Sequence, residues 1–183
     1  MTPPAESNRG FLIAEVRAFV MRARGLPGVR RIGLIGSLVT PKTNPKDADL
    51  LIWVDDQADL VRLAAAARQL KGRAQSRNSG ADVFLANPGG TYLGRICGYR
   101  DCRPGIRTSC RALHCGRRPR LCDDLDVLEL RSDVVQAPPV ELWPTALIHA
   151  AVPEDIQELV LSMDSDVLSR PEAPRRDQRS GSV

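Results

Sequence analysis

The sequence lacks any apolar run long enough to cross a membrane. A membrane-spanning helix needs roughly 18 or more consecutive apolar residues, and no stretch of the 183 residues approaches that length. The first residues also lack a basic segment followed by an apolar core, which is the pattern of a secretory signal peptide. We therefore expect a cytoplasmic protein with no membrane partner.

Lysine and aromatic residues are scarce as well. Arginines number 23 and lysines 3, a preference that a genome-wide bias explains more simply than a function does. Aromatic residues make up 4% of the chain, and only Tyr92 and Tyr99 lie near its most arginine-rich segment. Proteins that bind single-stranded nucleic acid stack bases on aromatic side chains. Their scarcity therefore argues against a dedicated single-strand reader.

The most informative segment holds Gly36 and Ser37 and, after nine further residues, Asp47 and Asp49. The apolar patterns predict one strand over residues 31–35 and another over residues 48–54. Side chains alternate along a strand, so the two aspartates should point the same way. Adjacent carboxylates repel each other unless a cation lies between them, and Mg²⁺ prefers one or two protein carboxylates together with substrate phosphates. The glycine turn and the Ser37 hydroxyl would suit phosphate oxygens.

A third carboxylate follows on a later strand. Residues after Asp56 show the three-four spacing of an amphipathic helix, at positions Leu60, Leu63, Ala64, Ala67 and Leu70. A polar loop is predicted over residues 72–80 and a short strand over residues 81–85, with Asp82 near its start. This order of elements would place Asp82 beside the first pair, as metal-assisted in-line displacement requires.

In these motifs, residues 30–87 resemble the DNA polymerase beta-type nucleotidyltransferase superfamily. The shared pattern is hydrophobic-Gly-Ser, nine residues, Asp-x-Asp-hydrophobic, and then a strand with a single Asp. Short members include antibiotic-modifying nucleotidyltransferases and the minimal nucleotidyltransferases of toxin–antitoxin pairs. The resemblance implies that Asp47, Asp49 and Asp82 bind Mg²⁺ and that Gly36 and Ser37 hold the triphosphate of an NTP. Lys42 or Lys46 would supply positive charge to those phosphates.

A cysteine cluster is the second informative feature, because all five cysteines lie within 26 residues. Four of them have the spacing C-x4-C, seven residues, C-x4-C, and clustered cysteines in a chain without a secretion signal favour metal binding over disulfides. The expected ligands of a structural zinc are Cys97, Cys102, Cys110 and Cys115, with His114 and Cys122 as alternates. Unligated or redox-active cysteines and disulfides remain alternatives. A catalytic zinc is not expected, because no Glu neighbours the cluster and it holds one His.

Charge is distributed unevenly around this cluster. Residues 95–122 carry eight arginines against one aspartate, whereas residues 123–169 carry eleven acids against one arginine, although the whole chain is only +4. The arginines would suit phosphate groups on a nucleotide or along a nucleic acid. A solvated basic loop is the equally favoured alternative.

The flanking segments complete the expected domain. An amphipathic helix is predicted over residues 7–23, with Leu12, Val16, Phe19 and Ala23 on its apolar face. A half-buried strand is predicted over residues 125–130. A last helix should start at Pro153 and bury Ile156, Leu159, Val160 and Met163. From Arg170 onward the composition favours a disordered tail.

The expected fold is therefore α/β (α+β), with a mixed nucleotidyltransferase sheet flanked by helices and a Cys-rich, zinc-binding insertion. The core would span residues 7–94, the insertion 95–122, a C-terminal strand and helix 123–169, and the tail 170–183. The expected function is Mg²⁺-dependent transfer of a nucleoside monophosphate from an NTP to an acceptor, which could be a small molecule, RNA or protein. The alternatives are a catalytically inactive, antitoxin-like binding protein and a zinc-containing nucleic-acid-binding module.

Overall fold

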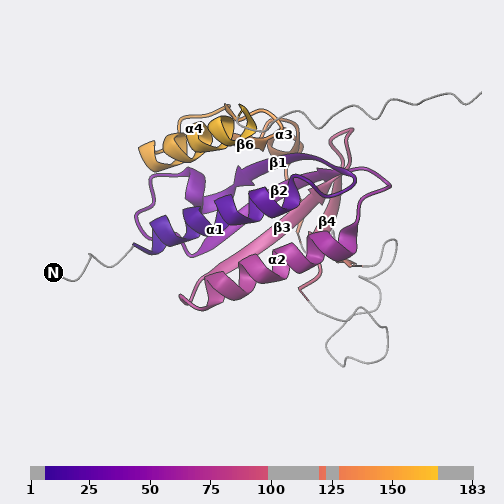
Figure 1. The fold of residues 1–183 in the computed structure, drawn as a ribbon, viewed down its shortest axis with the longest axis horizontal. Helices are drawn as coiled ribbons and strands as arrows, with labels where there is room; N and C mark the ends of the chain where they lie inside the picture. The colour runs from indigo at the N-terminus through magenta and orange to yellow at the C-terminus, as the bar shows by residue number, and fades with distance from the viewer. Residues whose placement is uncertain (1–6, 99–119, 123–127, 169–183) are drawn as a thin grey trace, which may run out of the picture.

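The computed structural model describes residues 7–98, 120–122 and 128–168. Four α-helices, one 3₁₀ helix and seven strands lie in this part of the chain (Figure 1). In chain order they are α1 (Asn8–Ala23), β1 (Val29–Ile35), η1 (Gly36–Val39), β2 (Asp47–Val54), α2 (Leu60–Gln75), β3 (Gly80–Ala86), β4 (Tyr92–Ile96), β5 (Leu121–Cys122), α3 (Ser132–Gln136), β6 (Val140–Trp143), β7 (Leu147–Ile148) and α4 (Glu154–Leu168).

The strands form one mixed sheet in the order β5-β4-β3-β2-β1-β6-β7. Strands β2 and β3 are parallel, and the other neighbouring pairs are antiparallel. A parallel pair needs a crossover connection, and α2 provides it here. The expected mixed sheet flanked by helices is thus confirmed.

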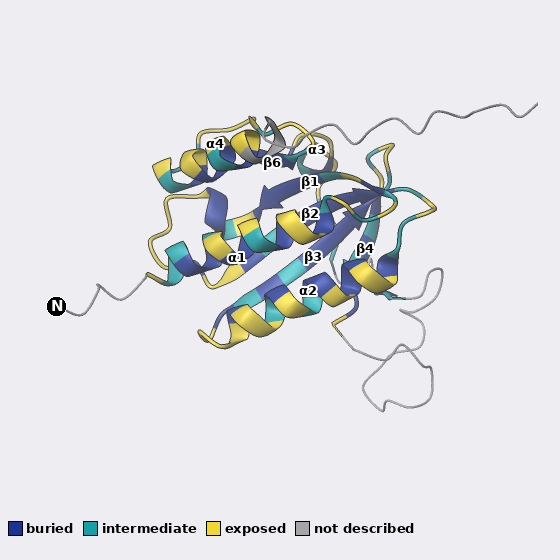
Figure 2. Cartoon of the chain, in the orientation of Figure 1, coloured by how far each residue is buried: buried dark blue, intermediate teal, exposed yellow. Residues whose placement is uncertain are grey.

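Helices α1, α2 and α4 cover one face of the sheet (Figure 1). Each turns a buried stripe to the strands and an exposed stripe outward (Figure 2). The main core lies between these helices and the alternate strand residues that face them. A second, smaller cluster lies on the opposite face, where Leu51, Trp53, Phe84 and Tyr92 meet Val135 of α3.

The predicted helices and first three strands are confirmed to within a few residues. Ser7 caps α1 by accepting a hydrogen bond from the Gly10 amide at 3.0 Å, and Asp59 caps α2 in the same way through the Arg62 amide. The positions predicted to face the core are all buried: Leu12, Val16, Phe19, Ala23, Leu60, Leu63, Ala64, Ala67, Leu70, Ile156, Leu159, Val160 and Met163.

The expected end of α2 was wrong, and one expected strand was wrong in the part of it that the structure describes. Helix α2 does not stop at Gly72 but continues to Gln75, because Ala74 is buried and Arg73 forms an ion pair with Glu15 of α1 at 2.9 Å. These contacts outweigh the cost of about 1 kcal/mol for glycine inside a helix. The strand expected over residues 125–130 is absent from its described part, residues 128–130. The sheet is extended instead by β6, which pairs with β1 and buries Val140 and Leu142.

The segment expected to be a cysteine-rich insertion is described only at its ends. Strand β4 runs across its expected start at residue 95, and β5 lies at its end and pairs with β4. Residues 99–119 lie outside the described residues.

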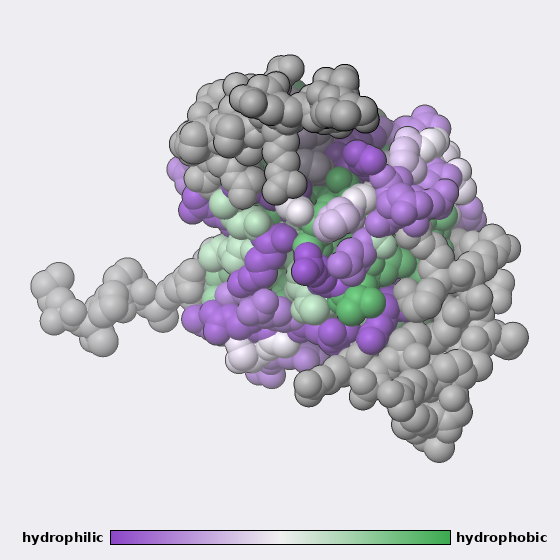
Figure 3. All heavy atoms as spheres, turned by 45° about the vertical axis from the view of Figure 1, so that its right-hand side comes forward, coloured by the Kyte–Doolittle hydropathy of each residue, from purple (hydrophilic) through white to green (hydrophobic). Residues whose placement is uncertain are grey.

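No helix of the described part combines the length and apolar character that a membrane span requires. On the face drawn in Figure 3, hydrophilic side chains cover much of the described surface, and smaller hydrophobic areas lie between them.

Candidate active site

Three aspartates lie on one face of the two parallel strands. Asp49 of β2 and Asp82 of β3 are paired positions in the register, as are Asp47 and Gly80. Asp47, Asp49 and Asp82 share the strand parity of Leu51, Trp53 and Phe84, which form the smaller cluster; these positions all face away from α1 and α2. The fold thus brings the three predicted carboxylates to one place.

The glycine turn closes directly against Asp49. Ile35 at the end of β1 pairs with Asp49, and Gly36 then takes a left-handed φ of 75° as the chain enters η1. A Cβ atom at Gly36 would overlap the Asp49 Oδ2 atom, and one at Gly80 would overlap Asp47 Oδ1. Both aspartates therefore depend on neighbouring glycines for room. The Ser37 hydroxyl lies 3.5 Å from the backbone carbonyl oxygen of Asp47.

Asp49 has an unusual charge environment. Burial, followed by the negative charges of Asp47 and Asp82, raises its pKa from 3.8 to about 6. Each of these causes disfavours the charged carboxylate. A cation beside Asp49 would offset the repulsion from Asp47 and Asp82. A bound metal ion would therefore favour the charged form of the Asp49 carboxylate.

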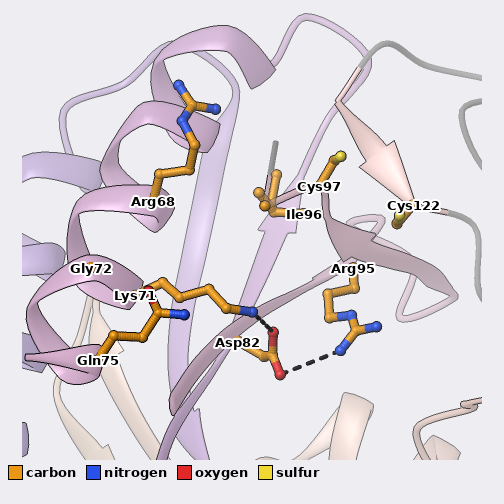
Figure 4. Close-up of a pocket in the computed structure, with 10 residues that line it drawn as sticks. Arg68, Lys71, Gly72, Gln75, Asp82, Arg95, Ile96, Cys97 and Cys122 are labelled. Carbon is orange, nitrogen blue, oxygen red and sulfur yellow. Dashed lines mark hydrogen bonds and ion pairs between the residues drawn. The ribbon is translucent and has the colours of Figure 1, made fainter. Parts of the chain in front are cut away.

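Asp82 is already paired with two cations. Lys71 Nζ of α2 lies 3.3 Å from Asp82 Oδ1, and Arg95 Nη1 of β4 lies 3.3 Å from Oδ2 (Figure 4). Both pairs are partly exposed, with 31% of the Asp82 side chain accessible, so their contribution to stability is modest. Their main effect is on position: they hold the Asp82 carboxylate between α2 and β4.

The donor set fits Mg²⁺ at Asp47 and Asp49. Both offer hard carboxylate oxygens, and a metal ion would neutralise the charges that raise the Asp49 pKa. In the described residues, however, no group of three His, Cys, Asp or Glu side chains could hold a metal ion as they stand. Asp82 would therefore become a ligand only after leaving Lys71 or Arg95. Magnesium binding by the three aspartates stays a prediction.

Arg9 fixes the loop between Gly36 and Asp47. Its guanidinium donates hydrogen bonds to the backbone carbonyls of Leu38 at 2.8 Å and of Thr40 and Lys42 at 3.1 Å. The same group forms two bonds with Asp155 of α4, at 2.5 and 2.9 Å, and these bonds lower the pKa of that carboxyl. One arginine therefore joins α1, the loop and α4.

The predicted phosphate-binding residues lie at or near the surface. Ser37 is half-buried beside Asp47, and the side chains of Lys42 and Lys46 are exposed on the loop. The Lys46 carbonyl accepts a hydrogen bond from the Gly80 amide at 2.7 Å, which ties the start of β2 to the start of β3. A role for either lysine in phosphate binding stays a prediction.

Two of the predicted zinc ligands are described. Cys97 is buried just after β4, Cys122 is half-buried on β5, and neither forms a disulfide bond in the described part of the chain. Cys122 pairs with Arg95 in the sheet, so both cysteines share the strand parity of Arg95. Cys102, Cys110, Cys115 and His114 lie outside the described residues. The zinc site and the nucleic-acid-binding alternative therefore stay predictions.

Lys71 and Arg9 were not identified from the sequence, and Arg95 was included only as one of the eight arginines of residues 95–122. Lys71 lies on a helix and Arg95 on a strand that no motif marks, and Arg9 lies 29 residues from Leu38, its nearest partner in the loop. Charge alone could not single them out among 26 basic residues. Their contacts with the loop and with Asp82 become visible only in the folded structure, where α1, α2 and β4 lie near these parts of the site.

Comparison with known proteins adds no relative. The chain matches no protein-family model, no curated protein and no solved structure.

Proposed function

We propose that this protein transfers a nucleoside monophosphate from an NTP to an acceptor hydroxyl and releases pyrophosphate. The observation that carries the proposal is the register of β2 and β3, which pairs Asp49 with Asp82 beside the left-handed turn at Gly36. Carboxylates next to a phosphate-sized glycine turn are the arrangement that magnesium-dependent phosphoryl transfer requires. The resemblance of residues 30–87 to polymerase beta-type nucleotidyltransferases agrees with it.

Each residue has a defined role in this proposal. Asp47 and Asp49 would hold Mg²⁺, which would supply positive charge to the triphosphate and to the developing negative charge. The backbone amides at Gly36 and the Ser37 hydroxyl would bind the leaving phosphates. Asp82 would orient the acceptor hydroxyl and accept its proton. The acceptor oxygen then bonds to the α-phosphorus, the bond to the β-phosphate oxygen breaks, and pyrophosphate leaves.

Label transfer tests the proposal. The wild-type chain and Asp49→Asn are incubated with each of the four α-labelled NTPs, Mg²⁺ and a whole-cell extract that supplies acceptors. We expect a labelled product with wild type and none with Asp49→Asn or with EDTA. Equal labelling by both proteins would refute the assignment. Asp56→Asn is the matched control, because Asp56 is an exposed carboxylate just after β2.

A specific observation favours a second candidate, a catalytically inactive protein of this fold that binds a partner. Both oxygens of Asp82 are engaged by Lys71 and Arg95, as in a structural ion-pair network. Isothermal titration of NTP with and without Mg²⁺ separates the two. Binding that requires Mg²⁺ and is lost in Asp49→Asn supports the transferase, and a lack of Mg²⁺-dependent binding supports the inactive form.

A further inference from the structure

A cavity of about 520 Å³ lies beside Asp82 at the edge of β3, and residues of α2, β3, β4 and β5 line it. Strand β4 pairs with β3 at Phe84, Leu85 and Ala86, so Asp82 lies beyond the described pairing of these two strands. The cavity opens at this edge. Its volume is that of an ordinary small-molecule site.

Among the residues that the structure describes, three cationic side chains and one carboxylate line the cavity. Arg68 and Lys71 come from consecutive turns of α2, Arg95 comes from β4, and Asp82 is the carboxylate (Figure 4). Arg68 and Lys71 are three apart on α2 and share a face of the helix; Lys71 reaches toward Asp82, whereas the Arg68 guanidinium points away from Lys71 and Arg95 (Figure 4). Ile96 and Cys97 form a less polar part of the wall. The lining thus combines positive charge with a small apolar surface.

The cavity shares Asp82 with the proposed active site. A ligand held there would lie against the carboxylate that is proposed to accept the acceptor's proton. Since Asp47, Asp49 and the Gly36 turn lie on the other side of Asp82 in the sheet, the cavity is separate from the proposed NTP site and adjacent to it. That is the position an acceptor must occupy.

We propose that this cavity binds the acceptor and that the acceptor is a small hydroxyl compound bearing a phosphate group. This inference rests on the proposed function. Lys71 and Arg95, whose head groups lie on either side of Asp82 (Figure 4), would bind the phosphate, because arginine and lysine pair with phosphate through charge-assisted hydrogen bonds. Arg68 would add positive charge farther along the wall. The hydroxyl would face Asp82. Cationic acceptors such as aminosugars are disfavoured by the same three positive charges.

Binding of ribose 5-phosphate, compared with ribose, tests the proposal without requiring catalysis. Titration calorimetry on the full chain should detect ribose 5-phosphate and much weaker or no binding of ribose. Arg95→Met and Lys71→Met should each weaken ribose 5-phosphate about tenfold, the usual effect of losing one charge-assisted hydrogen bond. Arg62→Met, on the exposed side of the same helix, should leave the affinity unchanged.

Two further arms identify the site. Asp49→Asn should still bind ribose 5-phosphate, so failure of nucleotidyl transfer and failure of this proposal give different results. A non-hydrolysable NTP with Mg²⁺ should leave the binding intact. Displacement by the NTP would show that these cations serve the triphosphate, and equal affinity for ribose and ribose 5-phosphate would show no phosphate site. Either result, or equal weakening by Arg62→Met, overturns the proposal.

Discussion

Asp49 and Asp82 are paired positions on the parallel strands β2 and β3, and their side chains lie on the same face of the sheet. The charges that surround the two carboxylates differ. Asp49 is half-buried beside negative neighbours, and its pKa rises to about 6, whereas Asp82 is paired with Lys71 and Arg95. Within the described part of the chain, the first carboxylate therefore lacks the counter-charge that the second already has.

Asp49→Asn should stabilise the metal-free protein above pH 6. The folded-state pKa of Asp49 is raised, so its contribution to stability is complete below its usual pKa of 3.8 and is lost as the pH rises through about 6. At neutral pH the loss is at most about 3 kcal/mol. Thermal unfolding in EDTA should give a higher Tm for Asp49→Asn at pH 7.5 and no such gain near pH 3.5. A lower Tm for the variant at pH 7.5 contradicts this account of Asp49.

Magnesium should raise the Tm of wild type more at pH 7.5 than at pH 5. A metal ligand must be deprotonated, and Asp49 holds its proton up to about pH 6. A ligand that binds only the folded state stabilises it in proportion to the logarithm of its concentration. Asp49→Asn should lose most of this Mg²⁺ response, while Asp56→Asn should keep it. The same Mg²⁺ response in all three proteins would place the metal elsewhere.

Gly36→Ala should disrupt the site, whereas Gly72→Ala should not. Alanine at Gly36 would adopt a left-handed φ and place its Cβ against Asp49 Oδ2, a destabilisation of about 1–3 kcal/mol. Gly72 lies inside α2, and a Cβ atom added there would meet nothing within 4 Å, so alanine should stabilise the helix by about 1 kcal/mol. Urea unfolding and Mg²⁺-dependent NTP binding of both variants provide the measurements. Normal NTP binding by Gly36→Ala would exclude a role for this turn.

Arg9→Met should destabilise the fold and loosen the loop that leads to Asp47. The Arg9 side chain is 11% exposed, and its loss leaves loop carbonyls and Asp155 without their donor, which corresponds to about 2–3 kcal/mol. Hydrogen exchange should become faster at the amides of residues 38–42. Arg62→Met, which removes an exposed arginine, should change stability by no more than about 0.5 kcal/mol.

The Arg9 pair also has its own pH dependence. Because Arg9 lowers the pKa of Asp155, the pair's contribution is present above the usual pKa of an aspartate and is lost as the pH falls through the lowered one. The stability difference between wild type and Arg9→Met should therefore shrink in acid. A difference that is constant with pH would contradict an electrostatic role for the pair.

The sequence predicted those parts of the fold that have a local signal. Apolar spacing located α1, α2 and α4, and the Gly-Ser and Asp-x-Asp pattern located the ends of β1 and β2. It did not predict that β6 would pair with β1, because a four-residue strand carries too short a pattern and its partner lies about a hundred residues away. The alternation of Leu128 and Leu130 suggested a strand, but these residues pack instead on the smaller cluster.

Some residues of the candidate site could likewise be predicted from the sequence, and others could not. Asp47, Asp49 and Gly36 lie within one short segment and could be grouped by spacing, and Asp82 could be added from the order of the elements. Lys71, Arg95 and Arg9 could not, because their assignment depends on which basic residues the folded chain places near the loop and near Asp82. Such contacts between distant segments leave no periodic trace in a sequence.

The most direct test of the central claim compares α-labelled and γ-labelled NTP as donors. Wild-type protein with Mg²⁺, extract and the preferred NTP should place the α-label in an acceptor and release the γ-label as pyrophosphate, and Asp49→Asn should do neither. That outcome requires the bond between the α- and β-phosphates to break, as nucleotidyl transfer demands. Transfer of the γ-label to the acceptor, or α-label transfer that survives Asp49→Asn, would contradict the proposed function.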